Sequence, residues 1–168
     1  MALKRTSNTI TIGAAVLESA PNTFTEQAVD LQLNPLDNEV FVVQAVNLDI
    51  SFPDAQAGVD STVTIAMTTT SQTAMPSLSS SNTLARKAQG IRALGFVDGG
   101  VGFTEAAGET PPSQLDYIGI ISTNDFFLQI LGDGNIAPKS GAVKVYGYRA
   151  KADSATYAAL VQSEVLSS

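Results

Sequence analysis

Four consecutive residues, Gly99-Gly100-Val101-Gly102, are the first candidates for a chemical site, because glycine-rich loops can hold phosphate groups on their backbone N–H groups. A Walker loop also needs Gly-Lys-Ser or Gly-Lys-Thr at its end, and no lysine stands there. The dinucleotide-binding spacing fails as well, and no strand–helix–strand pattern surrounds the glycines. The segment therefore predicts a flexible loop rather than a phosphate site.

The segment Gly132-Asp133-Gly134-Asn135 has a faint likeness to a calcium-binding loop. An EF-hand loop needs alternating Asp or Asn ligands and a glutamate at its twelfth position. Counted from Asp125 the twelfth residue is Ile136, and counted from Asp133 it is Lys144. Glycine and asparagine in this order are typical of tight hairpin turns, so we expect a turn here and no metal site.

Residue types that carry catalysis are scarce. The chain has no Cys, no His and no Trp, which excludes a cysteine nucleophile, a Ser-His-Asp triad and a zinc finger. The sixteen Asp and Glu could in principle form a glycosidase pair, but the sequence does not place two of them across a cleft. No Ser-x-x-Lys pattern occurs either. We therefore expect no enzyme, no catalytic residues, no metal and no cofactor.

The charge balance restricts the partners. Nine Lys and Arg stand against sixteen Asp and Glu, a net charge of −7, and an acidic chain is a poor general binder of nucleic acid. We expect no nucleic-acid contact. Two local basic spots, Arg86-Lys87 with Arg92 and Lys4-Arg5, are expected to meet acidic groups on a neighbouring subunit or solvent. No apolar run approaches the roughly 18–20 residues of a membrane-spanning helix, and membrane contact stays open.

The elements that would position these residues are strands. The clearest is Glu39–Phe52, in which apolar and polar residues alternate with a period of two and Pro53 follows. Only Gln44 interrupts the apolar face. That face is Val40, Val42, Val46, Leu48, Ile50 and Phe52, and we expect it to line a core with Val29, Leu31, Val63, Ile65, Phe126, Leu128 and Ile130.

Further strand patterns lie on both sides of a polar middle third. They are Thr25–Leu33, Ser61–Met67, Asp116–Ile121, Asp125–Leu131 and Ala142–Ala150. Residues 68–112 are rich in Ser, Thr and Gly, and we expect a loop-rich insertion outside the core, with at most a short helix near Leu84–Leu94. Asp153 or Ser154 can cap a C-terminal helix over Ala155–Leu166, within a terminal segment 153–168.

The first seventeen residues form either an N-terminal arm or a first strand. Their start loosely follows a signal peptide, but residues 9–12 alternate Thr and Ile, as a strand does. We expect both ends, 1–17 and 153–168, to contact other subunits or to cover an end of the domain. All 168 residues are expected to form a single domain, an all-β antiparallel sandwich with long central loops and a short C-terminal helix.

The order of these strands resembles single jelly-roll capsid proteins of tailless icosahedral viruses. The resemblance lies in the late pair Asp116–Ile121 and Asp125–Leu131, in the final strand Ala142–Ala150 with its Tyr148-Arg149 end, and in the early strands Thr25–Leu33 and Glu39–Phe52. It implies a jelly roll, a structural role and no catalytic residues. The helix after Asp153 departs from a minimal eight-stranded roll.

The composition is compatible with a shell built from many copies. Hydrophobic residues make up 44% and charged residues only 15%, against a usual charged share of about 25%. We expect a self-assembling subunit of a viral capsid, located in the virion, whose partners are copies of itself and other capsid proteins. Two alternatives remain: a subunit of a non-viral filament or surface layer, and a carbohydrate-binding β-sandwich module.

Overall fold

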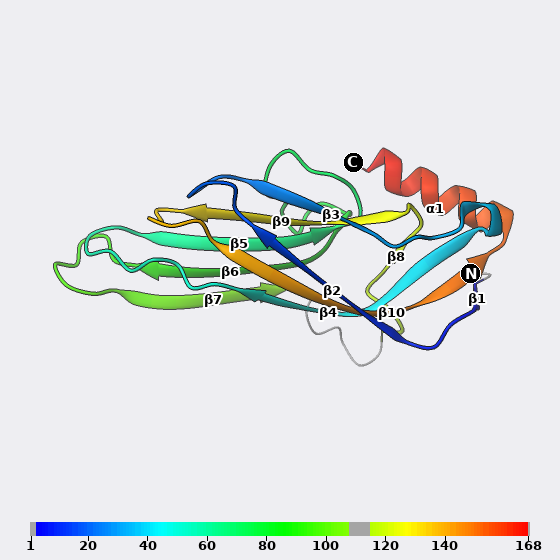
Figure 1. Ribbon diagram of the computed structural model, residues 1–168, viewed down its shortest axis with the longest axis horizontal. Coiled ribbons are helices and arrows are strands. Elements are labelled where there is room, and N and C mark those ends of the chain that lie inside the picture. The colour runs from blue at the N-terminus through cyan, green and yellow to red at the C-terminus, as the bar shows by residue number, and fades with distance from the viewer. Residues whose placement is uncertain (1–2, 108–114, 168) are drawn as a thin grey trace.

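A computed structural model describes residues 3–107 and 115–167 and arranges them as two antiparallel sheets and one α-helix (Figure 1). The first sheet contains β1 (Leu3–Arg5), β2 (Ile10–Leu17), β4 (Glu39–Ile50), β8 (Gly119–Ile121) and β10 (Ser140–Ala152). The second sheet contains β3 (Thr25–Asp30), β5 (Ser61–Thr68), β6 (Thr83–Arg92), β7 (Val101–Ala107) and β9 (Asp125–Asp133). A short 3-10 helix, η1 (Pro35–Asp37), precedes β4, and α1 (Ser154–Leu166) follows β10.

The strand order is that of a jelly roll. In the first sheet β10 lies between β2 and β4, and β8 completes the order β2-β10-β4-β8. In the second sheet β9 lies between β3 and β5, and the order is β3-β9-β5-β6, with β7 added at the edge. From β2 to β5 and again from β7 to β10 the chain crosses between the sheets at each connection, and its last two strands lie beside its first ones, as in two Greek keys. The expected fold class is confirmed.

The core lies between the two sheets. Of the residues expected there, Val46, Leu48 and Ile50 from β4 meet a second-sheet group that is almost fully enclosed: Val63, Ile65, Phe126, Leu128 and Ile130. Leu31 is buried with them and Val29 packs at the margin. These apolar side chains occupy alternate positions along their strands, so they share the face of each sheet that is turned toward the other sheet.

One interruption in β4 divides its apolar residues between two faces. The register with β10 shifts between Tyr146 and Gly147, and Gln44 is the extra residue on β4. A single extra residue reverses which side chains point inward. Phe41 and Val43 therefore enter the core, whereas Val40 and Val42, expected there, are buried on the opposite face. That part of the core prediction was wrong.

The expected core residue Phe52 is 73% exposed. The strand pairing with β10 ends at Ile50, and Ser51 donates its backbone N–H to the carbonyl of Ser140. Pro53 follows immediately and has no N–H to continue the ladder. The chain has therefore left the sheet before Phe52. The alternating pattern in the sequence extends two residues beyond the end of the strand, and this is why it placed Phe52 in the core.

The middle third is more regular than expected. β6 pairs with β5 and β7 along its length, so residues 83–92 and 101–107 are strands of the second sheet and no helix forms near Leu84–Leu94. Its inward positions include Ala85, a core residue, and Lys87, whose ammonium donates to the carbonyl oxygen of Leu48. Because one of the inward residues is a lysine, the sequence of β6 lacks the alternation of apolar and polar residues by which a strand is recognised.

Both ends of the chain are joined to the first sheet. β1 and β2 pair antiparallel with β10, and Val16 is buried in the core beside Ile10 and Ile12. Of the two expectations for the first seventeen residues, a strand rather than a free arm is found at residues 10–17, which form β2 of the first sheet. At the other end α1 packs through Tyr157 and Leu160 on the small apolar cluster formed by Val40, Val42 and Ala150. No helix in the described ranges is long and apolar enough to cross a membrane.

A buried carboxylate fastens α1 to the turn between β8 and β9. Glu164 is 7% exposed and accepts hydrogen bonds from the backbone N–H and hydroxyl groups of both Ser122 and Thr123. Helix formation itself begins at Asp153, whose side chain accepts from the backbone N–H of Thr156. The expected C-terminal helix and its cap are confirmed.

Replacing Glu164 with alanine should lower the free energy of unfolding by about 1–3 kcal/mol, because buried donors on Ser122 and Thr123 would lose their acceptor. The matched control is Gln162→Ala, an exposed position on the same helix. Urea unfolding followed by circular dichroism measures the difference. Equal midpoints for the two variants would contradict a fastening role for Glu164.

Candidate functional site: the loop end of the sandwich

Four connections meet at one end of the sandwich, which we call the loop end (Figure 1). They are the β2–β3 connection (18–24), the β4–β5 connection (51–60), the β6–β7 connection (93–100) and the β9–β10 connection (134–139). In a jelly roll these connections cross between sheets or between neighbouring strands at the same end. Loops on a rigid scaffold are where interaction residues concentrate, so their contacts decide what this end can do.

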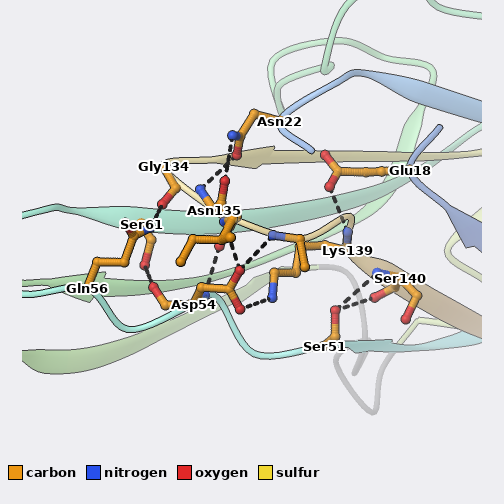
Figure 2. A network of polar contacts seen from close by, with 12 residues as sticks. Glu18, Asn22, Ser51, Asp54, Gln56, Ser61, Gly134, Asn135, Lys139 and Ser140 are labelled. Atoms are coloured by element: carbon orange, nitrogen blue, oxygen red, sulfur yellow. Dashed lines mark hydrogen bonds and ion pairs between the residues drawn. The ribbon is translucent and has the colours of Figure 1, made fainter. Parts of the chain in front are cut away.

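Asp54 holds the β4–β5 and β9–β10 connections together (Figure 2). Its carboxylate accepts from the backbone N–H groups of Ile136 at 2.9 Å and Ala137 at 3.0 Å, and from the Nζ of Lys139 at 2.5 Å. The Lys139 side chain is only 8% exposed. The hydrogen bond from Lys139, followed by those from Ala137 and Ile136, lowers the pKa of Asp54 from 3.8 to about 2.

Asn135 connects three loops from a nearly buried position. Its side-chain oxygen accepts from the backbone N–H of Asp54 at 2.8 Å, and its Nδ2 donates to the carbonyl of Thr62 at 2.9 Å. Its backbone N–H donates to the side chain of Asn22, which donates back to its carbonyl (Figure 2). A buried polar group with all these partners fixes one arrangement of the loops.

Glu18 adds a second buried anchor beside this network. It is 2% exposed and accepts from the backbone N–H groups of Gly132 at 2.6 Å and Lys139 at 2.7 Å. A Cβ atom at Gly132 would lie 2.7 Å from the Asn135 amide and 3.1 Å from the Glu18 carboxylate. Glycine at this position therefore allows the close approach that the network needs.

Asp60 binds the β6–β7 connection to the same end. Its carboxylate accepts from the backbone N–H groups of Ala93 at 2.8 Å and Leu94 at 2.9 Å, and from Arg92 at 3.0 Å. The backbone hydrogen bonds from Leu94 and Ala93 and then the Arg92 hydrogen bond lower the pKa of the Asp60 carboxyl. Through Asp54 and Asp60, three of the four connections are joined to one another by carboxylates that accept backbone N–H groups.

These ordered loops display large apolar side chains to solvent. The exposed ones are Phe52 at 73%, Val59 at 38%, Leu94 at 73%, Phe96 at 52%, Val97 at 87% and Ile136 at 70%. Loops usually carry polar residues, and single exposed hydrophobics need no explanation. Six of them lie in three connections that hydrogen bonds join at one end of the sandwich, and such a concentration of exposed apolar side chains is typical of a protein–protein contact.

The residues first considered for chemistry take structural places. Gly99 and Gly100 lie in the β6–β7 connection, as expected, whereas Gly102 belongs to β7. The segment Gly132–Asn135 does turn the chain, but β9 and β10 belong to different sheets, so the turn is a crossover and not the expected hairpin. No metal-ligand cluster occurs among the residues that the structure describes.

The two basic spots do not form basic surfaces. In the first spot, successive side chains of the strand point to opposite faces of the sheet. Arg86 and Arg92 lie on the outer face of β6, whereas Lys87 points inward to Leu48. At the far end of the molecule Arg5 lies over the ring of Tyr148, with its Cζ 4.3 Å from the ring centroid. Neither spot is a continuous basic patch.

Acidification should loosen the loop end. The pKa of Asp54 is held at about 2 in the folded chain, below its ordinary value of 3.8, so the carboxylate stabilises the fold fully above about pH 4. That contribution is lost as the pH falls through about 2. The melting midpoint measured from pH 2 to pH 6 should fall less steeply on acidification for Asp54→Asn than for the unchanged chain. Equal slopes for Asp54→Asn and for the unchanged chain would contradict the role of Asp54.

Comparisons with known proteins supply no family. No protein-family model and no curated protein matches the chain. Among solved structures, a chain of desmodium yellow mottle tymovirus is similar over 88% of this chain and 91% of its own length, with 14% identity and a TM-score of 0.33. The tailspike protein gp49 of Acinetobacter baumannii bacteriophage Fri1, a capsular polysaccharide depolymerase, matches 73% of this chain and 20% of its own, with 10% identity and a TM-score of 0.15. At these scores neither likeness carries an argument about function, which has to come from the fold and its surfaces.

Proposed function

We propose that the chain is a structural subunit that assembles with copies of itself into the shell of a virion. One observation carries the assembly: an end of the sandwich presents six exposed apolar side chains on loops that hydrogen bonds hold in place. A contact surface that is already ordered loses little conformational entropy on association. Apolar area removed from water then supplies the driving force.

The choice of a viral shell rests on the fold. A jelly roll is an architecture of capsid proteins as well as of lectins and cupins, so this step is an analogy at the level of the fold. The partners in this proposal are copies of the chain and other capsid proteins. Because the chain has a net charge of −7 and nucleic acid is a polyanion, the proposal includes no contact with nucleic acid.

Negative-stain electron microscopy of the purified chain tests this proposal against the two alternatives. A shell subunit should give closed particles of one diameter. Filaments of variable length would overturn the shell in favour of a filament or surface-layer subunit. A field that contains only small particles at every concentration would overturn self-assembly and favour a binding module.

A further inference from the structure

The outer face of the second sheet contains an open trough of about 530 Å³. The residues that line it come from β5, β6 and β7, and they are Thr62, Thr64, Arg86, Ala88, Gln89, Gly90, Arg92, Phe103, Thr104 and Glu105. The trough uses none of the exposed apolar side chains of the loop end. It therefore offers a second surface with a different chemistry.

The strand register explains the shape of the trough. Gly90 on the central strand is paired with Thr62 on one side and Phe103 on the other. Ala88, two residues away, is paired in the same way with Thr64 and Glu105. Positions two apart on a strand share one face of the sheet with the residues paired to them on the neighbouring strands. Because Ala88 and Gly90 are smaller than the side chains on both sides of them, they form the floor of the trough.

The charged groups of the trough are not equivalent. Arg92 already has a carboxylate, that of Asp60 at 3.0 Å. Arg86 is half-buried, and its Nε is a buried donor with no hydrogen-bond partner among the residues that the structure describes. The half-buried Arg149, by contrast, is paired with Glu39 at 3.1 Å. A planar guanidinium in this situation fits a carboxylate, which can accept two of its N–H groups at once.

The other lining groups narrow the chemistry of the occupant. Thr62 and Thr64 bring hydroxyl groups that both donate and accept, and Phe103 exposes an aromatic ring. Saccharides present hydroxyls together with apolar C–H faces, and this combination suits them. Glu105 would repel a polyanion such as nucleic acid or a run of acidic residues. We propose that the trough binds a short oligosaccharide that bears a single carboxylate, with that carboxylate on Arg86.

The test compares acidic and neutral saccharides on the purified chain. The probes are 3′-sialyllactose and a hyaluronan disaccharide, each with one carboxylate, with lactose as the neutral counterpart and hexaglutamate as an acidic peptide. Binding is measured by isothermal titration and by ligand-observed NMR. At least one acidic saccharide should bind more tightly than lactose and hexaglutamate. Arg86→Gln should weaken that binding roughly tenfold or more, because a charge-assisted hydrogen-bonded pair is lost.

The control is Lys144→Gln, which removes one positive charge from an exposed position on the first sheet and should leave binding unchanged. Circular dichroism verifies that both variants are folded. Equal affinity for acidic and neutral saccharides, or no binding of any probe, would overturn the proposal. Tighter binding of hexaglutamate, or equal weakening by both substitutions, would overturn it as well. None of these outcomes bears on whether the chain assembles, because the loop end is unchanged in both variants.

Discussion

Replacing Val46 with aspartate should leave no folded, soluble protein. Val46 is completely buried between the sheets among apolar core residues, on the part of β4 that follows the Gln44 bulge, and the inward Lys87 already donates to the carbonyl of Leu48. Burying an unpaired charge costs several kcal/mol, which is a large part of the stability of an ordinary domain. The soluble fraction after expression and the circular dichroism spectrum measure the loss.

The neighbouring residue supplies the matched control. Asn47 is exposed on the opposite face of the same strand, and Asn47→Asp introduces the same side chain next to its cross-strand neighbour Lys144. That variant should fold and melt close to the unchanged chain, because surface substitutions usually change stability by about 0.5 kcal/mol or less. A folded Val46→Asp protein would show that β4 is not the central strand described here.

A charge on the loop end should prevent assembly without unfolding the subunit. Val97 is 87% exposed, so Val97→Asp costs the isolated chain little. In an assembled contact the same carboxylate would lose its water, and each 1.4 kcal/mol lost from the contact weakens association tenfold. We expect the threshold concentration for assembly, measured by light scattering, to rise at least tenfold while the melting temperature stays the same.

Leu36 provides the control for this experiment. It is 93% exposed in η1, in the connection between β3 and β4 and outside the loop end. Leu36→Asp makes the same change of side chain and should leave the threshold unchanged. If both variants assemble like the unchanged chain, the loop end is not the contact surface. If both fail to assemble, the effect of Val97→Asp is one of net charge rather than of position.

The sequence was sufficient to predict most strands, because their pattern depends on neighbours along the chain. The expected strand Ala142–Ala150 lies within β10, and Ser61–Met67 forms nearly all of β5. The face of each residue was harder to predict. The sequence shows Gln44 as a polar residue on the apolar face of the strand. Whether such a residue points into the core or is the extra residue of a β-bulge depends on the pairing of β4 with β10, which the sequence of β4 does not contain.

The loop end could not be predicted, because its contacts join residues far apart in the sequence. Asp54 meets Lys139 and Glu18 meets Gly132, and nothing in the local sequence around Asp54 or Glu18 indicates these partners. The strand β6 was missed for a related reason. Its inward lysine, Lys87, is accommodated by a carbonyl on the opposite sheet, at Leu48, so it does not follow the apolar rule that identifies strands.

The most direct measurement of the central claim is sedimentation velocity of the purified, unchanged chain over a concentration series. A shell subunit should sediment above its threshold concentration as one fast, narrow boundary that belongs to a very large uniform particle. The remaining material should stay at the position of a small free subunit. A single slow boundary of monomer or small oligomer at every concentration would contradict the account.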